Sequence, residues 1–184
     1  MEKAFRFVLT QEEKDYLKQL VRLRIAARLS GRTVRVPEPP TALLREPHGA
    51  FVTLTLDGRL RGCIGHIVGD KPLFATIGAM AEAAAFEDPR FPPLTPGEFE
   101  RIAVEISVLS PLTPCPDPAL VEVGRHGLLM RRGMHSGLLL PQVPVEWGWD
   151  RETFLDQTCG KAGMEPGCWR DPATDLFWFE AEVF

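Results

Sequence analysis

A single cysteine stands between two glycines in the stretch DGRLRGCIGHIVGD, residues 57–70. The rest of the stretch is typical of an apolar strand, where a structural cysteine would not need Gly62 and Gly65 around it. Glycine inside a strand marks a bulge or a place where another group approaches the backbone closely. The pattern therefore predicts that Cys63 lies in a site, and that the two glycines leave room for a substrate or ligand.

Cys63 can be interpreted as a catalytic nucleophile. Arg61 in the same strand, and Arg90 from a later segment, would favour the thiolate through their positive charge. His66 or Glu105 would act as the general base if either one reaches the sulfur. In a regular strand a side chain three residues further on points to the opposite face, so a Cys63–His66 pair requires a bulge.

The same residues allow a different hypothesis, a non-catalytic module that binds a small anionic ligand or a partner protein. Cys63 is then a small buried wall, and the two glycines serve close packing. Basic residues would hold the anion and two polar residues would orient it: Arg61, Arg90 and Lys161, then Gln142 and Glu105. The two hypotheses differ in whether the Cys63 thiol is unusually reactive.

The four cysteines, at 63, 115, 159 and 168, contain no C-x-x-C pair, which argues against a zinc ribbon or thioredoxin-like chemistry. Cys63 and His66 have a spacing seen in metal ligands, but no second pair accompanies them, so we expect no metal site. No cofactor is indicated. A cytoplasmic setting argues against disulfides, although Cys159 and Cys168 could meet across a loop in a thermophilic protein.

Composition and charge set the broad class of the protein. The chain has no apolar run close to about 18 residues, the length that predicts a membrane-spanning helix. Its beginning, MEKAFRFVLTQEEK, lacks the features of a secretory signal, so we expect a cytoplasmic protein. The net charge is −4, and the basic cluster at residues 22–35 is more typical of a solvated helix face than of a nucleic-acid contact.

The candidate site is expected on a hairpin, because Asp57-Gly58 is a favoured pair for a tight two-residue turn. Such a turn predicts three cross-strand pairs: Leu56 with Arg59, Leu54 with Arg61, and Val52 with Cys63. Arg61 and Cys63 would then share one face, about 6–7 Å apart along the strand. Glu105 would lie mid-strand in the alternating stretch RIAVEISVLSPL, residues 101–112.

The remaining pattern completes the predicted fold. Helices are expected at about 11–29, with a capping box from Thr10 to Glu13, at about 71–87 with Asp70 as the cap, and at about 150–162 with Asp150 as the cap. A second hairpin is expected around Met134, with HGLLMRRG and GLLLPQVPVE as its strands, and a terminal strand in DLFWFEAEVF. Hairpins with a few long helices indicate an α+β protein with a mainly antiparallel sheet and flanking helices. We expect one compact unit, with room for a small subdomain.

Five blocks together resemble the AMMECR family, whose prokaryotic members are called AmmeMemoRadiSam system protein A. They are LRGCIG at 60–65, AFEDPRFPPL at 85–94, EISVLSPL at 105–112, GLLLPQV at 137–143, and FLDQTCGKAGM at 154–164 ahead of a CW pair. The resemblance covers the chain from about residue 8 to its end. It implies a single AMMECR-type domain over residues 1–184, with an antiparallel sheet and flanking helices.

The resemblance also implies where a site would lie and what surrounds the protein in the cell. It implies association with a Memo-like protein and a radical S-adenosylmethionine enzyme, and so a place in a modification system, without supplying a reaction. The family motifs fall on Arg61, Gly62, Cys63 and Gly65, on Asp88, Arg90 and Phe91, on Glu105 and Ser107, on Gln142, and on Cys159 and Lys161.

Overall fold

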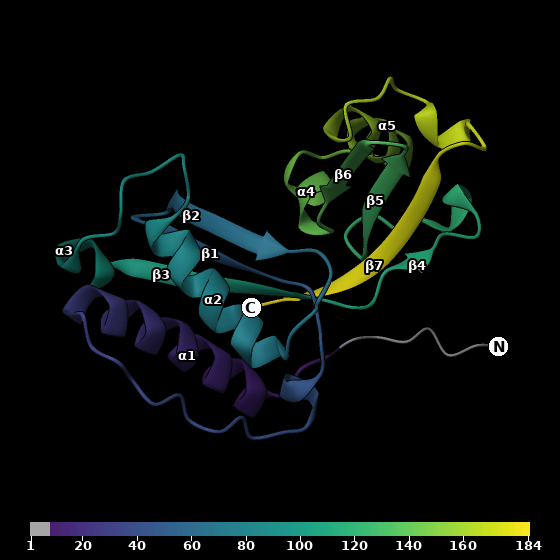
Figure 1. The fold of residues 1–184 in the computed structure, drawn as a ribbon. Helices are drawn as coiled ribbons and strands as arrows, with labels where there is room; N and C mark the ends of the chain where they lie inside the picture. Colours follow the sequence, from purple (N-terminus) through teal and green to yellow (C-terminus); the bar gives the residue numbers. More distant parts are fainter. Residues whose placement is uncertain (1–7) are drawn as a thin grey trace. The chain divides into compact units, whose positions relative to one another are not determined.

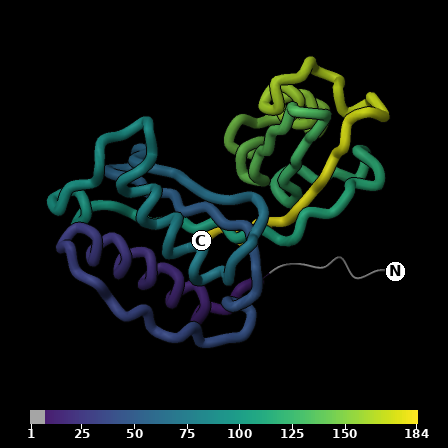
Figure 2. The backbone as a smooth tube through the Cα atoms, viewed as in Figure 1, coloured from purple at the N-terminus to yellow at the C-terminus, as the bar shows by residue number. Residues whose placement is uncertain are grey.

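The structure, a computed structural model, describes residues 8–184 (Figure 1). The described chain divides into two compact units. The N-terminal unit consists of Val8–Leu109 with Glu182–Phe184, and the C-terminal unit consists of Ser110–Ala181. Figure 2 follows the backbone through both units, with the end of the chain in yellow. Residues 1–7 lie outside the described residues. They belong to the stretch in which we expect no secretory signal.

A three-stranded antiparallel sheet forms the centre of the N-terminal unit. Its strands are β1 (Ala50–Leu56), β2 (Arg59–His66) and β3 (Ile102–Leu109), in the order β2-β1-β3. The end of the chain extends the sheet beside β3, because the N–H of Phe184 donates to the carbonyl of Ile106 at 3.1 Å and the carbonyl of Phe184 accepts from the N–H of Ile106 at 2.8 Å. This leaves β2 as the edge strand.

The N-terminal unit also contains two long helices, α1 (Gln11–Ser30) and α2 (Leu73–Phe86). The predicted capping box of Thr10 and Glu13 is present at the start of α1, and Gly31 ends that helix in the left-handed conformation with φ of 63°. Helix α2 begins later than predicted, after Pro72, so Asp70 is not its cap. The unit also contains the short helices η1 (Leu43–Arg45) and α3 (Pro96–Phe99).

Helix α2 lies very close to the sheet. Ala50, Val52 and Leu54 are fully buried on one face of β1, and the alanines Ala81, Ala84 and Ala85 are buried on the helix. Gly62 completes this contact, because a Cβ atom at this position would lie 2.0 Å from the carbonyl oxygen of Ala84. Small residues on both sides therefore let helix and sheet approach each other.

Antiparallel strands also form the C-terminal unit: β4 (Thr113–Pro114), β5 (His126–Arg132), β6 (His135–Leu139) and the main part of β7 (Asp175–Val183). β5 pairs with β6 and with β7, and β4 pairs with β7 on its other side. The helices are η2 (Pro118–Leu120), α4 (Gln142–Glu146), α5 (Arg151–Lys161) and η3 (Cys168–Arg170). The predicted cap of α5 is confirmed, since Asp150 accepts from the N–H of Thr153 at 2.8 Å.

The second predicted hairpin is correct in position but too long. Its strands are β5 and β6, and the second one ends at Leu139. The segment after Pro141 is the short helix α4, which we predicted as a continuation of the strand. Pro141 and Pro144 explain the difference, because proline cannot donate to a strand ladder and Pro141 is suited to the start of a helix.

Two of the four cysteines close a loop in the core of the C-terminal unit. Cys159 and Cys168 form a disulfide with a Cα–Cα distance of 5.9 Å across nine residues. Both lie in the cluster formed by Leu128, Met130 and Phe154. The alternative in which these two cysteines meet is therefore the one observed, while Cys63 and Cys115 are free thiols.

The α+β class with a mainly antiparallel sheet and flanking helices is confirmed. The single domain over 1–184 stays a prediction, with two compact units within its span. Among the described residues, no helix is both long enough and apolar enough to cross a membrane.

We expect Gly62→Ala to lower the free energy of unfolding by about 1–3 kcal/mol, because the new methyl group would collide with the backbone of α2. Urea denaturation of the purified chain measures the change. Gly97→Ala is the matched control, since a Cβ atom there has no neighbour within 4 Å. Equal stability of the two variants would contradict the close contact.

The double variant Cys159→Ala with Cys168→Ala is expected to lose roughly 2–3 kcal/mol of stability, because closing a loop of nine residues restricts the unfolded chain by about that amount. Denaturation under non-reducing conditions provides the measurement, with Cys115→Ala as the control. A native protein in which all four thiols react with a thiol reagent would rule out the disulfide.

Candidate functional site

A β-bulge at Arg61 changes the register of the hairpin that carries the site. Leu56 pairs with Arg59 as predicted, but Leu54 pairs with Gly62, and Thr53 pairs with Cys63. The predicted pairs of Leu54 with Arg61 and Val52 with Cys63 are therefore wrong. Because a bulge inserts one residue into only one strand, every pair beyond it shifts by one.

This register places Cys63 in a row of polar side chains across one face of the sheet. Thr53 lies between Cys63 on β2 and Glu105 on β3 as the direct partner of both. The hydroxyl of Thr53 donates to the Cys63 sulfur at 3.2 Å. Neighbouring strands lie about 4.8 Å apart, so Cys63 and Glu105 are separated by about 10 Å. Cys63 is half-buried and Glu105 is exposed.

The main chain of Cys63 is held by the segment after α2. Its N–H donates to Asp88 Oδ2 at 2.9 Å, and its carbonyl accepts from Arg90 Nη2 at 3.3 Å. Asp88 and Arg90 bind each other through two side-chain hydrogen bonds of 2.9 and 2.7 Å. Because β2 is an edge strand, these two side chains take the place of a neighbouring strand at Cys63.

The Asp88–Arg90 pair is charged over the whole physiological range. Hydrogen bonds from the Arg90 side chain are the main cause that holds the pKa of Asp88 well below its usual range, against the opposing effect of burial. The N–H of Cys63 adds to the lowering. The Asp88 carboxylate is only 2% exposed, whereas the Arg90 side chain is 53% exposed. The buried Asp88 carboxylate therefore holds the backbone of Cys63, while the Arg90 guanidinium remains accessible to solvent.

Arg61 is bound to a carboxylate of the following segment. Its guanidinium contacts Glu98 through Nε at 2.9 Å and Nη2 at 3.1 Å, and Nη2 also donates to the carbonyl of Pro92 at 2.9 Å. Hydrogen bonds from Arg61 are the main cause that lowers the pKa of Glu98 to about 2. Since Glu98 compensates its charge, Arg61 by itself does not supply an uncompensated positive charge for the thiol.

The ring of Phe91 brings Arg61 and Arg90 together. The guanidinium carbons lie 5.8 and 5.5 Å from the ring centroid, distances at which a cation is attracted to an aromatic face. Phe91 thereby joins the two arginines of the motif blocks, and each of these arginines also has its own carboxylate partner.

His66 lies on the opposite face of the sheet from Cys63. The register between these residues is regular, with Ile64 opposite Val52 and His66 opposite Ala50 at the end of β2. No bulge therefore turns His66 toward the sulfur. The Cys63–His66 dyad is not assembled in this arrangement.

Both glycines beside Cys63 have a packing role. A Cβ atom at Gly65 would lie 2.3 Å from the ring of Phe51, in the same way as one at Gly62 would meet α2. Phe51 and Gly65 are direct partners across β1 and β2, and Ser107 on β3 continues the same row. Other groups therefore approach the backbone closely at both glycines, as predicted. These groups are α2 and the ring of Phe51, which belong to the chain itself and not to a ligand.

Gln142 and Lys161 lie in the C-terminal unit. Gln142 is the first residue of α4, and its Oε1 atom is buried without a hydrogen-bond partner in the described part of the chain. Lys161 is the exposed last residue of α5. Their assignment as ligand-binding residues stays a prediction of that unit.

Like Glu98, Thr53 is a site residue that the sequence alone did not indicate. Its place beside Cys63 depends on the bulge, which shifts the partner of Cys63 from Val52 to Thr53. Threonine alternates with apolar residues in VTLTL, residues 52–56, so only the register distinguishes Thr53 from Thr55. Among residues 8–184, no group of three histidine, cysteine or acidic side chains is arranged to hold a metal ion.

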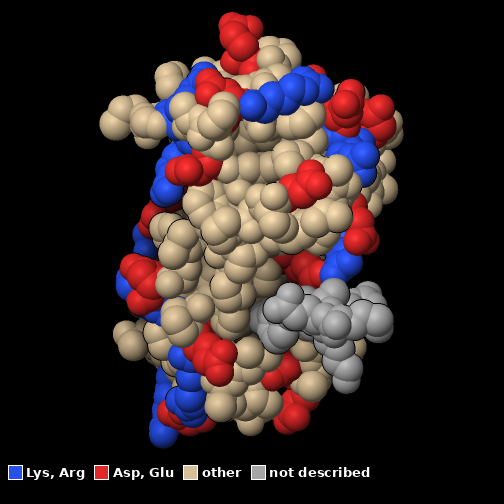
Figure 3. All heavy atoms as spheres, turned by 90° about the vertical axis from the view of Figure 1, so that its right-hand side faces the viewer, with Lys and Arg blue, Asp and Glu red and all other residues tan. Residues whose placement is uncertain are grey.

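The basic cluster at residues 22–35 is partly neutralised within the N-terminal unit. Arg24 forms an ion pair of 2.6 Å with Glu82, and Arg28 contacts the same carboxylate at 3.5 Å. Arg22 donates to the carbonyl of Ile102 at 2.8 Å. Basic and acidic residues are also interspersed on the face shown in Figure 3, without a continuous basic stripe.

Comparison with known proteins identifies the family. The model of the AMMECR1 family matches residues 18–184. This chain belongs to the AMMECR1 family. A protein of Thermococcus gammatolerans is 45% identical over 187 residues, which cover 96% of this chain and 91% of that protein. A protein of Methanothermobacter thermautotrophicus is 44% identical, with coverage of 96% and 95%.

A solved structure has the same fold. The crystal structure of the uncharacterised protein PH0010 from Pyrococcus horikoshii is 41% identical and superposes with a TM-score of 0.87. It covers 96% of this chain, and this chain covers 93% of it. The α+β fold is thus shared with this relative.

We expect Glu98→Gln to destabilise the folded protein by roughly 2–3 kcal/mol at pH 7, because it leaves the buried Arg61 without its counter-charge. The pKa of Glu98 is lowered from 4.5 to about 2 on folding, so the stabilisation is complete above about pH 4.5. It is lost as the pH falls toward 2.

Urea denaturation between pH 7 and pH 2 measures this effect as the stability difference between the two proteins. Glu100→Gln, a change at an exposed neighbour, is the control. A difference that stays constant down to pH 2 would show that the charge of Glu98 is not the cause.

Proposed function

We propose that this AMMECR1-family chain is a thiol-dependent component of a modification system, with Cys63 as the nucleophile. The observation that supports this most strongly is the hydrogen bond from Thr53 to the Cys63 sulfur on a partly exposed face of the sheet. A hydrogen bond donated to sulfur favours the thiolate over the thiol. Asp88 and Arg90 hold the backbone at the same residue, which keeps the sulfur in place.

The spacing of the row gives Glu105 a role different from that of a direct base. About 10 Å separates it from Cys63, and Thr53 lies between them. Glu105 therefore does not remove the thiol proton directly. It would bind the far end of a substrate that lies across the three strands beside Cys63. Such a substrate would carry a cationic or hydrogen-bond-donating group toward Glu105.

A binding module is the second candidate function, and the compensated arginine supports it. Arg61 is neutralised by Glu98, His66 faces away from the sulfur, and both glycines are used for packing. In this case the partly exposed Arg90 would contact a small anionic ligand or a partner protein. Gln142 and Lys161 would serve as contacts in the C-terminal unit.

The family resemblance supports a proposal about the cellular setting. We propose that the chain acts in the cytoplasm, together with a Memo-like protein and a radical S-adenosylmethionine enzyme. A chemical step that needs these partners would explain why the row on the sheet lacks an adjacent general base. Assays of Cys63 function would then require the reconstituted assembly.

Alkylation rates separate the two functions. We expect iodoacetamide to modify Cys63 faster than Cys115 in the native protein, because burial raises the pKa of the Cys115 thiol, whereas the Cys63 sulfur accepts a hydrogen bond from the Thr53 hydroxyl. Thr53→Val should slow the reaction of Cys63 by about two- to tenfold, the effect of one hydrogen bond. Peptide mapping by mass spectrometry follows both thiols in one sample.

Thr55→Val is the matched control, since Thr55 is on the same strand and is paired with Leu60 instead of Cys63. A Cys63 thiol that reacts no faster than Cys115, or that ignores the loss of the Thr53 hydroxyl, would rule out the nucleophile and leave the binding module.

A further inference from the structure

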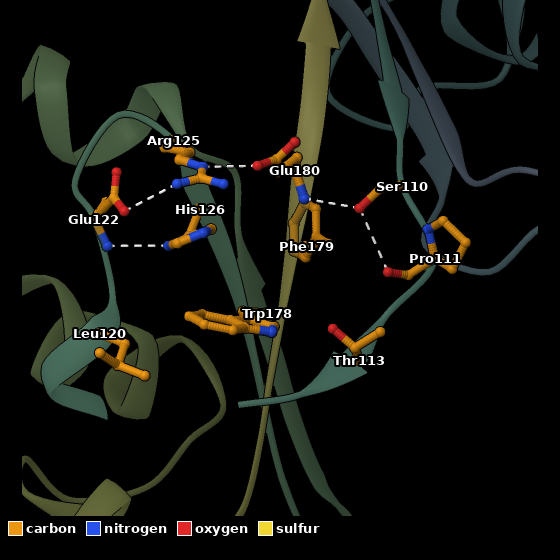
Figure 4. A pocket seen from close by; sticks show the side chains of 10 residues that line it. All are labelled: Ser110, Pro111, Thr113, Leu120, Glu122, Arg125, His126, Trp178, Phe179 and Glu180. Carbon is orange, nitrogen blue, oxygen red and sulfur yellow. Dashed lines mark hydrogen bonds and ion pairs between the residues drawn. The ribbon is translucent and has the colours of Figure 1, made fainter. Parts of the chain in front are cut away.

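The C-terminal unit contains a half-open cavity of about 780 Å³ that is separate from the Cys63 row (Figure 4). Pockets of about 300–1,000 Å³ are typical of small-molecule sites. The cavity lies where the face of β5 and β7 is lined by the segment from Ser110 to Glu122. Ser110 and Pro111 belong to the family block at 105–112, but none of the candidate site residues predicted from the sequence lines this cavity.

An indole ring forms one wall of this cavity. Trp178 on β7 packs partly against the core of the unit and remains partly exposed. Leu120, which is 53% exposed, also lines the cavity and lies to the left of Trp178 in Figure 4. A tryptophan beside an exposed leucine offers a flat apolar surface, and planar rings stack favourably against indole.

His126 lines the cavity and is 6% exposed, and its ring supplies one hydrogen-bond donor. Its Nδ1 atom accepts a hydrogen bond from the N–H of Glu122 at 3.0 Å, which leaves the proton of the neutral ring on Nε2. The imidazole lies 4.5 Å from the ring of Trp178 with a tilt of 35°. Burial, and then the charge of Arg125, lower the pKa of His126, which favours the neutral ring.

The charged residues of the cavity bind one another. Arg125 donates from Nε to Glu180 at 2.7 Å and from Nη1 to Glu122 at 2.9 Å. The backbone N–H of Glu180 donates to the Ser110 hydroxyl at 2.8 Å. With two carboxylates on its guanidinium, Arg125 is not a receptor for an anionic ligand. A neutral ligand fits this arrangement better than a negatively charged one.

We propose that this cavity binds an uncharged planar aromatic ring that stacks on Trp178 and accepts a hydrogen bond from Nε2–H of His126. The ligand class is a neutral aromatic or heteroaromatic ring with one hydrogen-bond acceptor at its edge. This site does not depend on the role of Cys63, and it adds a binding function to the C-terminal unit whichever function the row on the other unit has.

Two small amides and one carboxylate test the features of the proposed ligand one at a time. Benzamide has the planar ring and the neutral acceptor, cyclohexanecarboxamide keeps the acceptor without the planar ring, and benzoate keeps the ring with a negative charge. Titration into the ¹⁵N-labelled full chain follows the indole N–H signal of Trp178 by NMR. We expect benzamide to bind with a dissociation constant of about a millimolar, as befits so small a ligand, and the other two at least about fivefold more weakly.

Variants assign the binding to this cavity. Trp178→Leu should weaken benzamide binding at least about tenfold, and His126→Phe, which keeps a flat ring without the donor, about fivefold, the effect of one hydrogen bond. Trp147→Leu is the control, because Trp147 is exposed and outside the cavity. Ligand-detected NMR measures the variants that lack the Trp178 signal.

Leu120→Asp provides a variant that tests the wall without disturbing the core, since Leu120 is exposed. It should also weaken binding of benzamide. The proposal is overturned if cyclohexanecarboxamide or benzoate binds as well as benzamide, or if benzamide binding survives unchanged in folded Leu120→Asp and His126→Phe proteins.

Discussion

A buried carboxylate at the edge of a sheet holds the candidate site of this AMMECR1-family chain together. Asp88 accepts the N–H of Cys63 and, through both oxygens, the guanidinium of Arg90. Arg90 then donates to the carbonyl of the same cysteine. An edge strand otherwise exposes unpaired backbone groups, which are a template for aggregation. The Asp88–Arg90 pair satisfies those groups at the one residue whose sulfur faces the polar row.

The bulge at Arg61 gives this edge its chemistry. An extra residue in β2 leaves Arg61 without a strand partner, and its guanidinium binds Glu98 beside the ring of Phe91. Beyond the bulge, Cys63 faces Thr53 instead of a valine. One inserted residue therefore has two effects. Arg61 binds Glu98 instead of supplying the positive charge expected beside the thiol, and the thiol sulfur accepts a hydrogen bond from Thr53.

The two units are stabilised in different ways. The N-terminal unit depends on close contact between α2 and the sheet, which Gly62 and the alanines of α2 permit. The C-terminal unit is smaller, and a disulfide between Cys159 and Cys168 closes a loop within its core. Small cores gain much from such a covalent link. The cavity beside Trp178 lies at the end of the same sheet face as that core.

The sequence by itself determined most of the elements and pointed to the family. The capping box at Thr10 and Glu13, the cap at Asp150 and the Asp57-Gly58 turn are local signals, because each depends on residues only a few positions apart. The five motif blocks likewise lie in the chain order of the family. Only the tertiary structure decided which side chains meet. The bulge shifts the register of the hairpin, and the Thr53–Cys63 contact and the Arg61–Glu98 pair join residues 10 and 37 positions apart. Alternation along a strand cannot reveal a one-residue insertion, and that insertion reverses which face each later side chain occupies.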